Sequence, residues 1–151
     1  MNYLVAVDGS SESESALEHA LELAGAMETP ASVTVVHSVD PEVESEAGVP
    51  ADADVTDADR LLVIEGPEDA EDRGQKLLDR AVEFAADRGH EVDAELLYGD
   101  PAESIAEFAE AGEFDGLFVG HRGLSERMER LLGSTAKRLV EQSPVPVTVV
   151  S

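Results

Sequence analysis

Apolar residues follow two alternating patterns along the chain. Short runs rich in valine, typical of buried strands, occur at 3–7, 32–37, 92–98, 116–119 and 145–150. Between them, apolar residues recur at helical spacing, as in Leu17, Ala20, Leu21 and Ala24. Strands that alternate with amphipathic helices fold as a parallel sheet with crossover helices, so the pattern predicts one α/β domain over residues 1–151.

Two of the predicted helices have recognisable starts. Ser11 with Glu14 has the spacing of a capping box. In the segment 100–103, Asp100 is a candidate N-cap and Pro101 a candidate first helical residue. Further helices are expected around 78–85 and 136–140, where alanine, leucine and valine recur at the same spacing.

One stretch fits neither pattern. Residues 40–66 are acidic and contain Pro41, Pro50 and Ala-Asp repeats, so we predict a mobile acidic surface insertion. Its apolar residues 61–64 are compatible with either a short strand or a helix anchor.

Charge changes this picture more than any other feature of composition. The chain has 34 acidic and 10 basic residues, a formal net charge of −24, which disfavours nucleic acid and anionic membranes as partners. The acids are spread over the whole chain, which favours adaptation to high salt over a single cation-attracting site. The chain has no cysteine. No apolar run approaches the roughly 18 residues of a membrane span and no signal-like segment opens the chain, so we expect a cytoplasmic protein.

A glycine-rich segment follows the fourth predicted strand. Two residues separate Gly120 from Gly123, and nine residues separate Gly123 from Gly133 and Ser134, which open the last helix. Glycine lets the backbone approach an oxyanion, and the N–H groups and dipole at a helix start suit a phosphate. Five basic residues also gather here, namely Arg122, Arg127, Arg130, Lys137 and Arg138. The arrangement favours a phosphate site over an ordinary capped turn.

This segment and several others resemble the universal stress protein family. ATP-binding members carry Gly, two residues, Gly, nine residues, then Gly and Ser or Thr, a spacing that Gly120, Gly123, Gly133 and Ser134 reproduce. The resemblance extends to 5–10 (VAVDGS), 35–37 (VVH), 99–101 (GDP) and 144–147 (PVPV). It implies an open five-stranded parallel sheet in the order 3-2-1-4-5 with helices on both faces, a Rossmann-like fold of the adenine nucleotide alpha hydrolase-like class.

The resemblance also implies a stress-response or regulatory protein with a nucleotide cleft at the carboxyl ends of strands 1 and 4. Ala6, Val7 and Asp8 would flank adenine and ribose, and the backbone at Ser38 would meet the adenine edge. The remaining nucleotide-binding residues would be Gly120, His121, Arg122, Gly123, Gly133, Ser134 and Thr135. Ser38 and Thr135 stand where ATP-binding relatives usually carry an aliphatic residue and a valine. Asp8 also fits a turn residue before the helix, and that alternative stays open.

The expected ligand is ATP, or ADP or AMP in its place, with a Mg or Mn ion that bridges the phosphates and Asp8. No Walker lysine follows the glycines and no general base stands beside them, so we expect no catalytic residue and little or slow hydrolysis. The alternative function is a non-catalytic homodimeric interaction module that does not depend on nucleotide. The apolar strand Val145–Val150 would be an exposed sheet edge, which invites pairing with a second copy.

Overall fold

The five strands form one parallel sheet in the order β3-β2-β1-β4-β5, as predicted. The computed structural model describes residues 1–29, 31–39, 67–121 and 135–150. The strands are β1 (Asn2–Ala6), β2 (Ser32–Val39), β3 (Asp93–Tyr98), β4 (Gly116–Gly120) and β5 (Val147–Val150). The insertion predicted at 40–66 lies outside the described residues.

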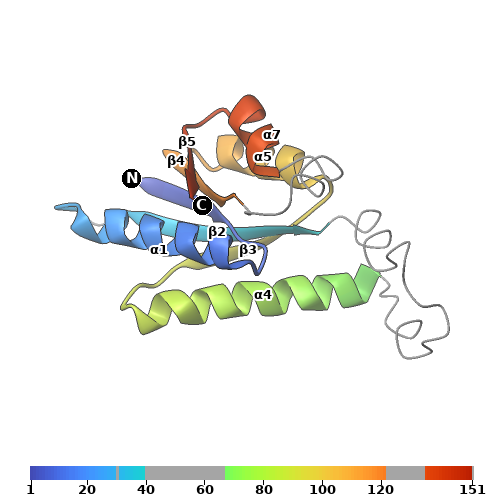
Figure 1. Ribbon diagram of the computed structural model, residues 1–151, viewed down its shortest axis with the longest axis horizontal. Coiled ribbons are helices and arrows are strands. Elements are labelled where there is room, and N and C mark those ends of the chain that lie inside the picture. The colour runs from blue at the N-terminus through green and yellow to red at the C-terminus, as the bar shows by residue number, and fades with distance from the viewer. Residues whose placement is uncertain (30, 40–66, 122–134, 151) are drawn as a thin grey trace.

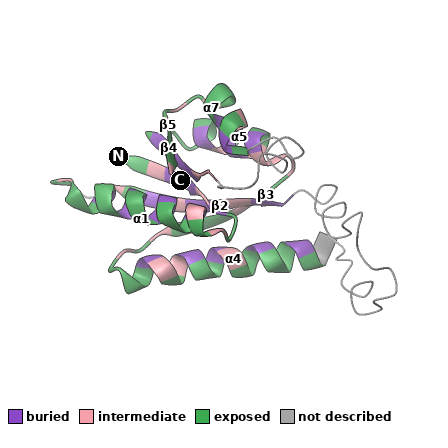
Figure 2. Ribbon diagram, in the orientation of Figure 1, coloured by how far each residue is buried: buried purple, intermediate pink, exposed green. Residues whose placement is uncertain are grey.

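Helices cover both faces of the sheet (Figure 1). Helices α1 (Ser11–Ala26) and α4 (Pro67–Asp87) lie on one face, and α5 (Pro101–Ala111) and α7 (Thr135–Gln142) lie on the other. Successive strand residues point to opposite faces, so Val5 packs in the α1–α4 layer whereas Leu4 packs in the α5–α7 layer. The buried residues accordingly line the inner sides of the helices and the sheet between them (Figure 2).

The starts of two helices test the capping predictions. Asp100 is the N-cap of α5, and its side chain accepts a hydrogen bond from the backbone N–H of Glu103 at 3.0 Å, as predicted. For α1 the predicted cap is wrong: the N-cap is Ser10, whose hydroxyl accepts from the N–H of Ser13 at 3.1 Å. The preceding turn holds Ser10 in the extended conformation that a cap requires, and this leaves Ser11 inside the helix.

The winding of the sheet reverses between β1 and β4. These strands are parallel neighbours, with Ala6 beside Val119, and β1 is followed by α1 whereas β4 leads towards α7 on the opposite face. Chain segments that leave two adjacent strands towards opposite faces open a crevice at the carboxyl edge of a sheet. The predicted site residues Asp8 and Gly120 lie at these two strand ends.

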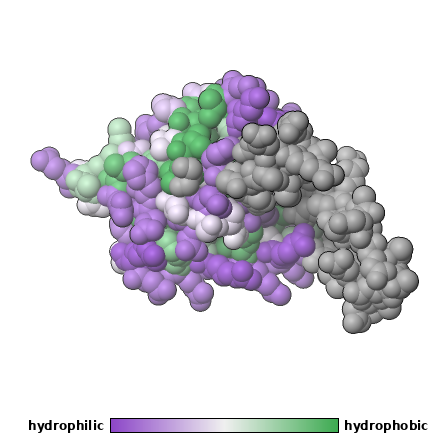
Figure 3. Space-filling view, in the orientation of Figure 1, coloured by the Kyte–Doolittle hydropathy of each residue, from purple (hydrophilic) through white to green (hydrophobic). Residues whose placement is uncertain are grey.

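One edge of the sheet is an apolar strand. Strand β5 begins two residues later than predicted, and Val149 has 43% of its surface exposed. Val140 is one of the apolar residues of α7, and 55% of its surface is exposed. Apolar residues gather over the region of β5 in an otherwise mostly hydrophilic view (Figure 3).

Among the described helices, none combines the length and apolar character that a membrane span needs.

Candidate functional site

The end of β1 is tied to the end of β2 by backbone and side-chain hydrogen bonds. The N–H of Val7 donates to the carbonyl of Val36 at 2.9 Å. The Nδ1 atom of His37 lies 2.8 Å from the carbonyl oxygen of Val7, and because a carbonyl can only accept, this nitrogen carries the hydrogen. His37 is therefore a satisfied polar residue that fixes the point where the chain turns towards Asp8.

Asp8 forms the turn that precedes α1. Its Oδ1 atom accepts a hydrogen bond from the N–H of Ser10 at 2.9 Å and another from the Ser10 hydroxyl. The N–H of Asp8 itself donates to the hydroxyl of the buried Ser13 at 3.3 Å, and Gly9 has a φ of +82°. The turn role left open for Asp8 is thus confirmed. Its contact with a ribose or a metal ion stays a prediction.

Gly120 ends β4 directly against the first turn of α1. A Cβ atom on Gly120 would overlap the backbone carbonyl carbon of Glu12 and would lie 2.5 Å from the backbone nitrogen of Ser13. The glycine is therefore required for close packing, and the side of its Cα that a Cβ would occupy is filled by α1. The next residue, His121, is half-buried and its N–H donates to the carbonyl of Val150 at 2.8 Å.

Strand β2 pairs with β1 on the side away from β4, and it runs past the end of β1. Its pairing with β1 ends at Ala6 and Val36, whereas its pairing with β3 continues to Val39. Ser38 is buried, and its hydroxyl lies 3.2 Å from the carbonyl oxygen of Gly99 and 2.6 Å from the hydroxyl of Ser104. The side chain of Ser38 therefore links β2 to the start of α5.

An ion pair joins the starts of α5 and α7. The two guanidinium nitrogens of Arg138 bond the two carboxylate oxygens of Asp100 at 2.7 and 2.8 Å. Arg138 holds the pKa of Asp100 below its usual value, and Asp100 raises the pKa of Arg138. In the sequence, Arg138 is one of the five basic residues that gather around the glycine segment. In the structure, its guanidinium forms an ion pair with the carboxylate of Asp100.

Part of the predicted phosphate loop lies outside the described residues, namely Arg122, Gly123, Gly133 and Ser134. Thr135 is described as the exposed first residue of α7. Within the described ranges no group of three or more His, Cys, Asp or Glu side chains is placed to hold a metal ion. The Mg or Mn ion expected at Asp8 stays a prediction.

Sequence reasoning missed several side-chain contacts near the carboxyl ends of the strands. Ser10 and Ser11 are both residues that favour an N-cap, so the local sequence does not decide between them. The pairing of Asp100 with Arg138 has no local signal, because 38 residues separate the two side chains.

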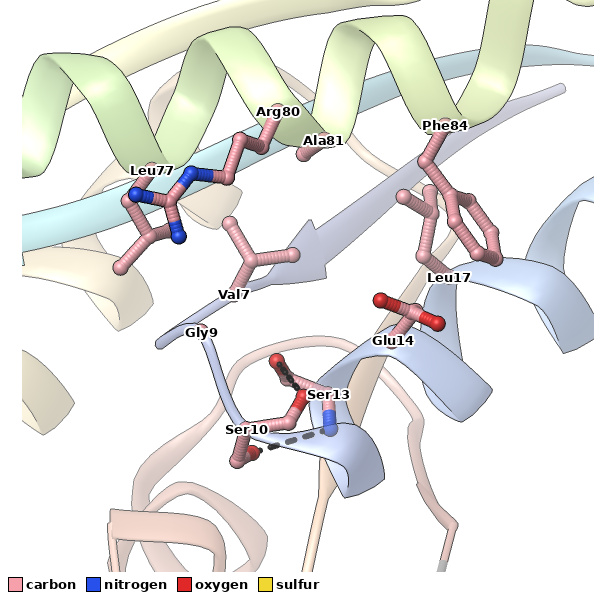
Figure 4. Close-up of a pocket in the computed structure, with 10 residues that line it drawn as sticks. All are labelled: Val7, Gly9, Ser10, Ser13, Glu14, Leu17, Leu77, Arg80, Ala81 and Phe84. Atoms are coloured by element: carbon pink, nitrogen blue, oxygen red, sulfur yellow. Dashed lines mark hydrogen bonds between the residues drawn. The ribbon is translucent and has the colours of Figure 1, made fainter. Parts of the chain in front are cut away.

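A small hollow lies beside the Asp8 turn, between α1 and α4 (Figure 4). Its volume is about 120 Å³, and Gly9, Ser13, Leu17, Leu77, Arg80 and Phe84 are among the residues that line it. Sites for small organic ligands usually measure about 300–1,000 Å³, so this hollow is too small for a nucleotide. It also lies on the α1–α4 face, away from α7.

Fold and strand ends together define a doubly wound parallel α/β protein whose candidate site lies where the winding reverses. The profile of the Universal stress protein family matches residues 1–151, and the chain belongs to that family. The universal stress protein MJ0531 of Methanocaldococcus jannaschii is 32% identical over 147 residues, which cover 97% of this chain and 79% of that protein. YxiE of Bacillus subtilis is 32% identical over 157 residues, with 97% and 96% covered.

Solved structures share the fold over nearly the whole chain. A universal stress protein in complex with cAMP superposes with a TM-score of 0.70 at 23% identity, with 100% of this chain and 97% of that chain covered. An Arabidopsis thaliana family member with AMP bound superposes with a TM-score of 0.63 at 22% identity, with 99% of this chain and 90% of that chain covered. The universal stress protein from Archaeoglobus fulgidus in complex with dAMP also has a TM-score of 0.63 at 22% identity, with 100% of this chain and 98% of that chain covered.

Proposed function

We propose that this chain is a regulatory, stress-response protein that binds an adenine nucleotide, foremost ATP, at the carboxyl ends of β1 and β4. The observation that carries the proposal is the meeting of the Asp8 turn and Gly120 at two adjacent parallel strand ends whose chain continuations diverge. Such a switch point is where open α/β sheets bind their ligands.

The relatives support the ligand class. The three solved structures named above hold cAMP, AMP or dAMP, each of which combines adenine with one phosphate group. The choice of ATP rests on the spacing of Gly120, Gly123, Gly133 and Ser134, which matches the pattern of ATP-binding family members.

Roles follow from position along the crevice. Ala6, Val7 and Asp8 would flank adenine and ribose, and the backbone at Ser38, where β2 outruns β1, would meet the adenine edge. The phosphates would lie along the glycine segment and the start of α7 at Thr135, with Mg or Mn between them and Asp8. A bound divalent cation would also offset the repulsion between a nucleotide anion and a chain of net charge −24.

Binding is tested first on the protein as purified. Mass spectrometry of released ligand identifies any nucleotide retained, and calorimetric titrations with ATP, ADP and AMP in high salt, with and without Mg²⁺, give the affinities. We expect ATP to bind with a Kd below about 1 mM, roughly −4 kcal/mol, and phosphate release to be slow or undetectable. Failure of all three nucleotides to bind below this concentration would contradict the proposal.

Two substitutions localise the phosphates. Gly123→Val and Gly133→Val are expected to abolish ATP binding, because a branched side chain would fill the space that the phosphates need. Gly25→Val, in the last turn of α1 at the opposite edge of the sheet, is the matched control and should leave affinity unchanged. Retained ATP binding in both loop variants would remove the glycine segment from the site.

A second function is favoured by the apolar sheet edge. Strand β5 ends the sheet in the described residues, and its exposed Val149, with Val140 of α7, offers an edge that a second copy can pair with. Sedimentation equilibrium should show a dimer that dissociates in Val149→Lys but persists in Leu23→Lys, a change at an apolar residue of α1 that is 40% exposed. A wild-type monomer would refute the dimer, and a dimer without nucleotide binding would favour the interaction module.

A further inference from the structure

The ion pair between Asp100 and Arg138 connects two helices on the α5–α7 face. Each of two guanidinium nitrogens of Arg138 donates to a different carboxylate oxygen of Asp100, so the pair fixes orientation as well as distance. The side chains are 32% and 39% exposed, which places the pair at the rim of the molecule rather than in the core.

The carboxylate side of this pair is held firmly. Asp100 also caps α5, and Gly99 before it donates a hydrogen bond to the carbonyl of Val39 at 2.9 Å. The hydroxyls of Ser38 and Ser104 join the same turn to the end of β2. Asp100 is therefore an anchor built on the ends of β2 and β3.

The guanidinium side belongs to a short helix. Helix α7 has eight residues, and an isolated helix of that length is unstable in water, so tertiary contacts must set its orientation. Ala136 and Leu139 are its buried contacts, and Arg138 lies in its first turn. The N–H groups of a first helical turn lack partners within the helix and can serve an anion.

We propose that Asp100 and Arg138 are positioning residues that orient the first turn of α7 towards the nucleotide phosphates. The inference rests on the proposed nucleotide site and assigns neither side chain a contact with the ligand. Because Arg138 is engaged by Asp100, its effect on binding runs through the placement of α7 and Thr135 and not through its own charge.

Comparing ATP with adenosine separates an effect on the phosphate subsite from a general loosening of the protein. Affinities for ATP and for adenosine are measured for Arg138→Gln and Asp100→Asn in 1 M NaCl, where a Debye length of about 3 Å suppresses long-range charge effects. We expect each variant to weaken ATP binding about tenfold and to leave adenosine binding unchanged. Asparagine is as good an N-cap as aspartate, so Asp100→Asn alters the ion pair and keeps the cap of α5.

Three further variants sharpen the result. The double variant should lose no more affinity than either single one, because both remove the same interaction. Arg138→Lys should restore part of the loss, since lysine keeps the charge without the bidentate fork. Arg88→Gln is the matched control: it removes the same charge from the end of α4, where the guanidinium stacks on Phe84 at 3.5 Å, and should change neither affinity.

Equal ATP affinity in wild type and both single variants would overturn the positioning role, as would a parallel loss of ATP and adenosine binding. Additive losses in the double variant would also overturn it. A wild-type protein that binds no adenine nucleotide would contradict the proposed function itself, which distinguishes the two failures. Should Arg138→Gln fail to fold, Asp100→Asn and Arg138→Lys carry the same comparison.

Discussion

Gly116 and Gly120 begin and end β4, and they differ in how much space surrounds the Cα atom. A Cβ atom on Gly116 would meet nothing nearer than 3.5 Å, an ordinary contact with the ring of Tyr3. The same atom on Gly120 would overlap backbone atoms of α1, which cannot move aside as the end of a flexible side chain can. Gly120 thus sets how closely β4 approaches the first turn of α1.

Gly120→Ala should therefore destabilise the protein by about 3 kcal/mol, because α1 and β4 must separate to admit the methyl group. Urea unfolding followed by circular dichroism measures the change. Gly116→Ala, in the same strand, is the control and should stay within about 1 kcal/mol of wild type. Equal stability of the two variants would mean that the end of β4 does not pack on α1 as described.

At the scale of elements, the start of each helix depends on what the preceding turn does. Asp8 holds Ser10 in place, so α1 begins one residue earlier than the candidate cap Ser11 indicated. Asp100 caps α5 as its sequence context predicted, and in the folded protein it also holds α7 through Arg138. One carboxylate thus serves two helices.

This double role predicts a pH dependence. The pKa of Asp100 is lowered in the folded protein, chiefly by Arg138, so the stabilisation from the pair is complete above the unfolded pKa of about 3.9. It is lost as the pH falls through the lower folded value. The difference in unfolding free energy between wild type and Arg138→Gln should be about 1 kcal/mol at pH 7 and should vanish in stronger acid.

Urea unfolding of both proteins between pH 7 and pH 2 gives this difference directly. Arg88→Gln is again the comparison, because the guanidinium of Arg88 contacts the ring and the backbone carbonyl of Phe84, neither of which titrates. A difference for Arg138→Gln that stays constant into acid would show that the ion pair does not contribute in solution.

At the scale of the whole molecule, self-repulsion is the dominant electrostatic feature. A net charge of −24 on 151 residues opposes the compact state, and dissolved salt screens that repulsion. The Debye length falls from about 10 Å at 0.1 M to about 3 Å at 1 M. Salt adaptation, which the spread of acids over the chain favours, stays a prediction that this screening can test.

The melting temperature should accordingly rise with NaCl, by about 6 °C between 0.1 M and 2 M if screening contributes about 2 kcal/mol. Differential scanning calorimetry measures it. The rise should be smaller at a pH close to 4, where many carboxylates bind protons. A melting temperature that does not change with NaCl concentration at neutral pH would argue against salt adaptation.

Local pattern was enough to place the strands, the helices and the cap at Asp100, because apolar spacing and capping chemistry act over a few residues. The glycine and serine spacing, through its resemblance to a family, also indicated the order of the strands and the candidate site. Tertiary structure alone decided the cap at Ser10, the packing of Gly120 on α1 and the pairing of Asp100 with Arg138. Each of these depends on how a turn or a distant element is placed, and a local pattern carries no information about that placement.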